Sequence, residues 1–228
     1  MKDSYHRRVN SGMPTALVVI TTVAVFLLLL LLFSRSQGIS IAILMNDPFS
    51  TMNAPIYTGI SSNIGIIFWF SAAAICLYSY MIIKNNIYDK SVKLFVLFTG
   101  ILTLYLALDD FFMLHEIYRD FLHVPEILTY IIYGILMVVY LLKFSNMILE
   151  SEYSILLILA FIFMGSSIMF DTMQKISFIP KIPYRNFFED GFKLIGIIYW
   201  FSFIICYCKK LFIQALPYKN TQQDKPPV

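Results

Sequence analysis

Charged residues are scarce in this sequence. Asp, Glu, Lys and Arg together make up 14% of its 228 residues, whereas a soluble domain usually contains about 25%. The formal net charge is only +3. The basic residues stand mostly at the ends of apolar segments, where they act as topology signals rather than as a nucleic-acid footprint. The composition therefore excludes an ordinary soluble domain, and we expect no nucleic-acid partner.

Cysteine and histidine are also rare, with three residues of each. Cys76, Cys206 and Cys208 are an odd number without an obvious pairing, so they indicate buried or interfacial thiols rather than a disulfide framework. The chain lacks the Glu-x-x-His pairs of di-iron bundles and the H-E-x-x-H motif of zinc proteases. It also lacks an internal repeat, so an inverted-repeat transporter architecture has no support.

Long hydrophobic runs are what the sequence has in abundance, with 59% hydrophobic residues and a mean hydropathy of +0.74. A helix needs about 20 apolar residues to cross the hydrocarbon core of a bilayer. The sequence therefore predicts an all-α fold, a polytopic integral membrane bundle of six transmembrane helices. The six predicted segments are Pro14–Ser34, Tyr57–Ile83, Lys93–Tyr118, Glu126–Ser145, Tyr153–Met173 and Gly191–Ile213.

The first of these segments is predicted to be a retained helix. Its apolar run, "ALVVITTVAVFLLLLLLF", is longer than the core of a signal peptide, which has about 7–15 residues. Most of the basic residues then fall on the side of the N-terminus, which predicts that both termini are cytoplasmic. We expect a cytoplasmic segment over residues 1–13, a transmembrane domain over 14–214, and a disordered, polar and proline-rich tail over 215–228.

The stretch "LALDDFFMLHE" places ionisable groups inside the third predicted helix. Such groups are costly in a membrane and mark functional sites by default. If the helix continues past this stretch, Asp109, Glu116 and His123 share one face, because they are spaced seven residues apart. On the same geometry, Asp110 and His115 lie on opposite flanks of that face.

Other predicted helices carry polar residues at the same outer depth, so we expect an outward-facing polar site. Three of these residues have simpler explanations. Glu189 and Asp190 can cap the start of the last helix, and Lys193 can pair with Glu189, four residues earlier. The polar residues on these other helices are Asn63, Asp171, Glu189, Asp190 and Lys193.

Carboxylates facing a histidine suit several kinds of chemistry. Oxygen and imidazole ligands fit a divalent metal (Zn, Mn, Fe or Mg) that activates water for hydrolysis. The candidate catalytic residues are Asp109, Asp110, His115 and Glu116. The candidate metal ligands are Asp109, His115, Glu116, Asp171 and Glu189, with Asp190, Lys193 and Asn63 in support.

Our leading hypothesis from the sequence is a metal-assisted enzyme that acts on a lipid or envelope substrate, with membrane lipid as its partner. Two alternatives remain open. Clustered acids in a low dielectric also suit a proton- or cation-coupled transporter. A buried ion network can equally serve only to hold the helices together or to bind a ligand without chemistry.

"LALDDFFMLHE" and the later "FEDGFKLIGIIYW" together resemble a pattern in uncharacterised bacterial polytopic membrane proteins. In that pattern a D-[DE]-x4-H-E helix precedes an acidic pair at the start of a late helix. The resemblance covers residues 109–116 and 188–200 and implies a shared site and a location in the bacterial plasma (inner) membrane, but no known activity. Lys193 stands where we expect a third acid in some members, which complicates any count of metal ligands.

Intramembrane hydrolases of the alkaline ceramidase type are similar to this chain in a more general way. They combine several helices with acids and histidine near one membrane face. They also use several histidines, including a spaced pair on a late helix, whereas no histidine follows His123 here. The chain is therefore not assigned to them.

Overall fold

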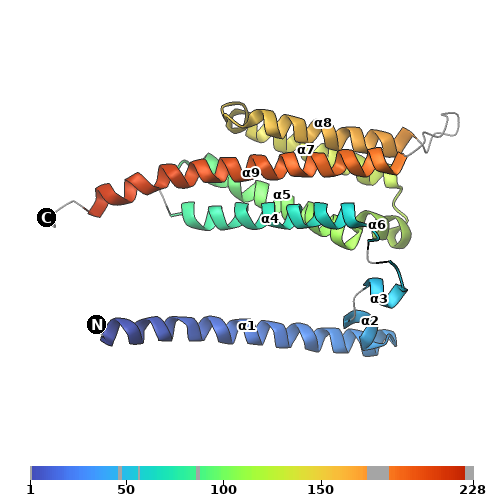
Figure 1. Ribbon diagram of the computed structural model, residues 1–228, viewed down its shortest axis with the longest axis horizontal. Coiled ribbons are helices and arrows are strands. Elements are labelled where there is room, and N and C mark those ends of the chain that lie inside the picture. The colour runs from blue at the N-terminus through green and yellow to red at the C-terminus, as the bar shows by residue number, and fades with distance from the viewer. Residues whose placement is uncertain (1, 46–47, 56, 86–87, 174–184, 224–228) are drawn as a thin grey trace. The chain divides into compact units, whose positions relative to one another are not determined.

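The computed structural model describes residues 2–45, 48–55, 57–85, 88–173 and 185–223, and its elements are helical throughout these ranges (Figure 1). The chain divides into two compact units, Met1–Thr58 and Gly59–Val228. Each unit is described by itself below.

The first unit consists of one long helix and two short ones. Helix α1 runs from Lys2 to Gln37, so it includes most of the segment predicted as a cytoplasmic N-terminal piece. Its apolar part contains a span, Ile20–Gln37, that is long and apolar enough to cross a membrane. Helices α2 (Ile41–Met45) and α3 (Pro48–Met52) follow in the segment between the first two predicted spans.

The second unit is a bundle of long helices with one short helix at one end (Figure 1). Helix α9 packs against both α4 and α8, and α4 also packs against α5. Helix α7 contacts α5, α8 and the short helix α6. The bounds are α4 Ile60–Ile83, α5 Lys90–Phe112, α6 Leu114–Leu122, α7 Glu126–Leu149, α8 Ser154–Met173 and α9 Arg185–Gln223.

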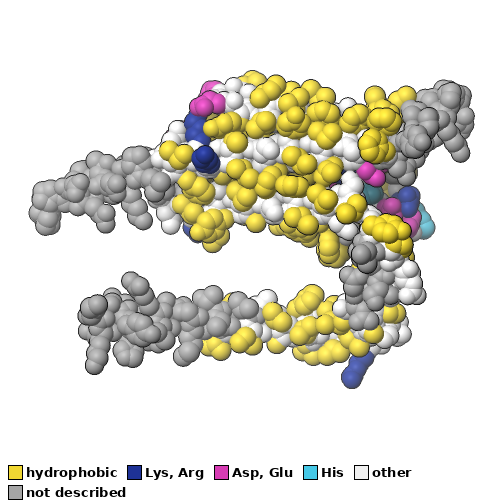
Figure 2. Space-filling model, in the orientation of Figure 1, with side chains coloured by type: hydrophobic (Ala, Val, Ile, Leu, Met, Phe, Trp, Pro, Cys, Tyr) yellow, Lys and Arg dark blue, Asp and Glu magenta, His cyan; other side chains and the backbone are white. Residues whose placement is uncertain are grey.

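Six helices in the described part of the chain are long and apolar enough to span a membrane, which confirms the predicted count and the multi-pass membrane class. Hydrophobic side chains cover the flanks of the second unit, whereas charged side chains gather toward the two ends of its helices (Figure 2). This distribution is what a hydrocarbon layer around the bundle requires, because unpaired charge is costly at that depth. Which side is cytoplasmic stays a prediction.

Aromatic rings and close helix contacts hold the second unit together. The Trp200 side chain is completely buried and donates its indole N–H to Oγ1 of Thr103, at 3.0 Å. Its ring packs against Trp69 and Phe161. At Gly196 an added Cβ atom would approach the backbone N of Met164 to 3.0 Å, so the missing side chain lets α9 lie directly on α8.

Two helices have ends that differ markedly from the predicted segments. The third helix was predicted to continue to Tyr118, but α5 ends at Phe112 because Met113 adopts a left-handed conformation with φ 50°. The shared face predicted for Asp109, Glu116 and His123 therefore does not exist as one helical stripe. The last helix begins at Arg185 rather than at Gly191 and continues to Gln223, past the predicted end at Ile213. Residues 224–228 of the predicted tail lie outside the described residues.

Candidate functional site

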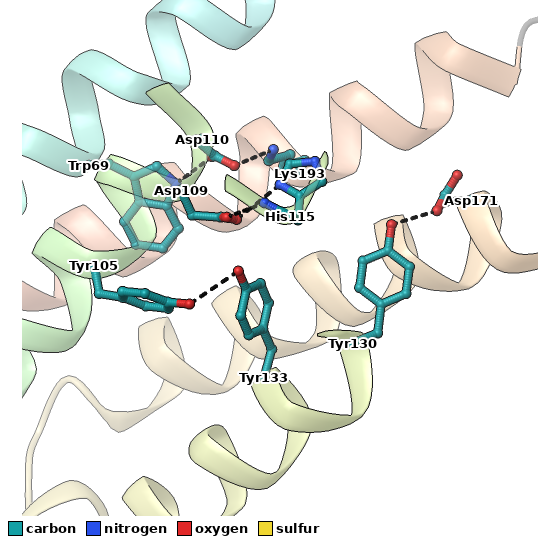
Figure 3. Close-up of polar contacts among 9 residues, drawn as sticks. All are labelled: Trp69, Tyr105, Asp109, Asp110, His115, Tyr130, Tyr133, Asp171 and Lys193. Atoms are coloured by element: carbon teal, nitrogen blue, oxygen red, sulfur yellow. Dashed lines mark hydrogen bonds and ion pairs between the residues drawn. The ribbon is translucent and has the colours of Figure 1, made fainter. Parts of the chain in front are cut away.

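Asp109 and His115 are brought together by the break between α5 and α6. The Asp109 carboxylate is buried and accepts two hydrogen bonds from His115, from the backbone N–H to Oδ1 at 3.0 Å and between Nδ1 and Oδ2 at 3.1 Å (Figure 3). The first four N–H groups of a helix have no partner within it. Asp109 therefore caps α6, and its negative charge complements the positive end of that helix.

The break is thus part of the site's construction. In a continuous helix, side chains six residues apart point in very different directions. The left-handed Met113 redirects the chain, and its backbone N–H bonds the carbonyl oxygen of Asp109. His115 then folds back onto the carboxylate instead of lying on a separate flank.

Asp110 makes a second pair one residue away. Its Oδ1 accepts a hydrogen bond from Nζ of Lys193 at 2.7 Å, and its Oδ2 accepts one from the indole N–H of Trp69 at 3.0 Å (Figure 3). Lys193 on α9 therefore has a partner on α5 that its spacing to Glu189 did not suggest. Each oxygen of Asp110 thus accepts one hydrogen bond, which holds the carboxylate between α4 and α9.

A small pocket of about 10 Å³, roughly the room that one water molecule needs, adjoins this pair. Asp110 and Lys193 form one part of its wall, and Asp190 supplies a second carboxylate. The serines at the start of α4 add hydroxyl groups that can donate or accept. The lining residues are Ser61, Ser62, Gly65, Asp110, Asp190, Lys193, Leu194 and Ile197.

Tyrosine hydroxyls surround the other side of the site. Tyr105 donates to the hydroxyl of Tyr133 at 3.3 Å, and Tyr130 donates to Oδ2 of Asp171 at 2.9 Å. Figure 3 shows Asp171 at a separate position on α8, next to Tyr130 and away from the Asp109–His115 contact. Asp171 therefore belongs to a neighbouring contact and not to the pair itself.

The remaining predicted residues take peripheral positions. Glu116 lies on α6 and forms an ion pair with Arg119 at 3.9 Å. Asn63 is exposed and is not among the residues that line the cavity. Glu189 is half-buried in the second turn of α9.

The predicted metal site finds no support in this arrangement. All five predicted ligands have described side chains, yet the described residues contain no group of three or more His, Cys, Asp or Glu that could hold a metal ion. What Asp109 and His115 form instead is a carboxylate–imidazole pair.

The electrostatics of His115 follow from this pair. The hydrogen bond to Asp109 raises the pKa of the His115 imidazole above its ordinary value of about 6.5, although partial burial acts in the opposite direction. Lys193 lowers the pKa of the same ring and Asp110 raises it, so the two pairs are electrically connected.

The chain matches the model of a family described as a domain of unknown function, DUF8692, over residues 16–207. It belongs to this family. The matched region of the DUF8692 chain contains Asp109, Asp110, His115 and Lys193, and it begins within α1 and ends within α9. No curated protein and no solved structure matches the chain.

Trp69 is the site residue of this DUF8692 member that the sequence did not reveal. It lies 41 residues before Asp110 in the middle of an apolar helix, where a tryptophan is typical of ordinary core. The usable signal was its indole N–H, a donor that needs a partner when buried. Because the helix around Trp69 offers few side-chain acceptors, the partner of this N–H is expected on a neighbouring helix, and an acidic residue is a suitable one.

Proposed function

We propose that this chain is an integral membrane enzyme that uses Asp109 and His115 as an acid–base pair on a lipid or envelope substrate. The contact that carries the proposal is the hydrogen bond of 3.1 Å between Nδ1 of His115 and Oδ2 of Asp109. A carboxylate at Nδ1 favours the tautomer that carries its proton there, which leaves the Nε2 lone pair to accept another proton. Hydrolytic enzymes orient a catalytic histidine in this way.

The chemistry follows from the groups around the ring. Nε2 of His115 takes a proton from a water molecule, and the water oxygen attacks an ester or phosphoester bond of the substrate. The same proton then passes from His115 to the oxygen of the leaving group, so the imidazole returns to its starting state. Asp109 stabilises the imidazolium that exists between these two steps.

Lys193 supplies positive charge beside the cavity. Its side chain is 39% exposed, and its ammonium group has two further N–H donors besides the one on Asp110. These donors suit a substrate oxygen on which negative charge develops. Asp110 and Trp69 keep the lysine in position for this role, and Ser61 and Ser62 offer hydrogen bonds to a polar headgroup.

The packing below the site favours an enzyme over a transporter. A proton or cation route through the bundle needs a chain of polar groups or water. Directly below Asp110, Trp69 packs on Trp200, and the bundle interior continues with the buried rings of Phe95 and Phe203. The buried hydroxyl of Thr99 bonds the backbone of its own helix and Tyr140. The polar site is therefore at one end of a packed core.

A lipid substrate is consistent with the place of the pair. Asp109 belongs to the last turn of a candidate span, Lys90–Phe112, and His115 follows it by six residues. The chemistry would then take place near the depth of the lipid headgroups, at the outer face if the predicted orientation holds. We propose the bacterial plasma (inner) membrane as its location.

The test is turnover of lipid by the purified full chain in vesicles made from bacterial polar lipids. Products released into water and left in the bilayer are identified by mass spectrometry. The decisive variants are His115→Asn and Asp109→Asn, and the matched control is His123→Asn. His123 is the other histidine near α6, and asparagine tolerates its left-handed backbone.

We expect the parent and the His123→Asn protein to form product at the same rate. The His115→Asn protein should be slower by at least about 100-fold, the smaller end of what a positioned general base contributes. A His115→Asn protein that keeps the parental rate contradicts the proposal. Bound metal at one ion per chain, with activity lost on chelation, would instead favour the metal-assisted hypothesis drawn from the sequence.

A further inference from the structure

Helix α6 has sharply separated faces. Apolar side chains recur at intervals of three and four residues, which places them on one side of the helix. Charged and imidazole side chains occupy the other side. The apolar face comprises Leu114, Ile117, Tyr118, Phe121 and Leu122, and the polar face comprises His115, Glu116, Arg119 and Asp120.

The apolar face of α6 is largely uncovered. Phe121 is 83% exposed, Leu122 is 65% exposed and Ile117 is 43% exposed. Phe111 and Phe112, at the end of α5, are also exposed. A soluble protein rarely leaves a contiguous patch of this kind in water.

The connections of α6 fix where this surface lies. The helix follows α5 after a single residue, and α5 contains the span Lys90–Phe112. The next span begins at Leu128, only six residues after α6 ends at Leu122. Since both spans meet the same membrane surface at these ends, α6 has no room to leave the level of that surface.

The charges of α6 point to the kind of lipid contact. Helices that bind anionic membranes by charge carry several lysines or arginines on their polar face. Here Arg119 is the one such residue of α6, and it forms ion pairs with Asp120 at 2.9 Å and with Glu116 at 3.9 Å. Attraction to anionic headgroups is therefore a minor contribution, and the apolar face supplies the contact.

We propose that α6 lies in the plane of the membrane surface and inserts its apolar face, with Phe121 at its centre, among the acyl chains of the leaflet. The partner is the lipid layer itself, and the contact does not require anionic lipid. The proposal rests on the exposed face and the chain connections, and it does not depend on the acid–base role of His115.

The test uses single spin labels on adjacent residues of opposite faces, Phe121→Cys and Asp120→Cys. Each is placed in the full chain with Cys206→Ser, because Cys76 and Cys208 are buried and Cys206 is partly accessible. The protein is reconstituted in vesicles of zwitterionic lipid. Collisions of each label with oxygen, which concentrates in the bilayer, are compared with collisions with a water-soluble nickel chelate.

We expect the label at residue 121 to favour oxygen severalfold more than the label at 120 does. The difference should persist when anionic lipid is added and when salt is raised. Equal exposure of both labels to the nickel chelate overturns the proposal, because α6 then stands in water. A label at 121 that is shielded from both reagents and broadened by a neighbouring label also overturns it, because a second copy of the chain then covers the face.

Discussion

Removing the contact between Asp109 and His115 should destabilise the fold by an amount that depends on pH. The carboxylate side chain is 7% exposed and the imidazole 26% exposed, so solvent screens their interaction only weakly. A hydrogen bond to a charged group contributes about 1.5–3 kcal/mol. We therefore expect a coupling energy of this size from the cycle of Asp109→Asn, His115→Ala and the double variant.

The sign of the pH dependence follows from the raised pKa of His115. The unfolded chain binds the proton less tightly than the folded protein, so the folded state gains from protonation. This gain is complete below the pKa of the unfolded chain, about 6.5, and is lost as pH rises through the higher pKa of the folded state. The coupling energy should therefore be larger at about pH 5.5 than at about pH 9.

The assay is unfolding of the purified chain in mixed micelles by increasing SDS, followed by far-ultraviolet circular dichroism. His123→Asn serves as the control, because His123 is exposed and asparagine tolerates its left-handed backbone. The effects of two independent substitutions usually add to within about 0.5 kcal/mol. A coupling energy below this value at both pH values would refute the reasoning.

Three further predictions concern the surroundings of the pair. Lys193→Met should lower stability by about 1.5 kcal/mol, the lower end of the range for a hydrogen bond to a charged group, because the lysine is partly exposed. The tryptophan emission spectrum should shift as well, since Asp110 also accepts a hydrogen bond from the indole of Trp69. Gly196→Ala should lower stability by about 1–3 kcal/mol through overpacking, whereas Gly165→Ala, with no atom within 4 Å of the added Cβ, should leave the same SDS midpoint unchanged or slightly raised. Treatment with EDTA should change neither the SDS midpoint nor lipid turnover, and a loss of either would revive the metal site.

Hydrophobic length made the six spans predictable. A run of about 20 apolar residues has few alternatives to crossing a bilayer, and each predicted segment overlaps a span of the structure. The exact ends were harder to predict, since helices extend beyond the hydrocarbon layer. Helix α9 shows this, because its polar ends at Arg185 and Gln223 lie well outside its apolar centre.

The geometry of the site was not predictable from helical periodicity. Nothing in methionine favours a left-handed backbone, which costs about 1–2 kcal/mol in an L-residue. The break at Met113 becomes understandable only with the capping of α6 by Asp109. The ion pair of Lys193 with Asp110 was missed for a similar reason. A spacing of four residues points to Glu189 on the same helix, whereas Asp110 is brought near by the packing of different helices.

The most direct test of the acid–base pair is nitrogen NMR of histidine-labelled protein in lipid nanodiscs, titrated with acid and base. The signals of His115 are assigned by their loss in the His115→Asn variant. We predict that His115 of the parent titrates above the ordinary histidine pKa of about 6.5 and carries its proton on Nδ1 when neutral. The Asp109→Asn substitution should lower this pKa and remove the preference for the Nδ1–H tautomer. An imidazole that titrates at the same pH with and without the Asp109 carboxylate would contradict the account.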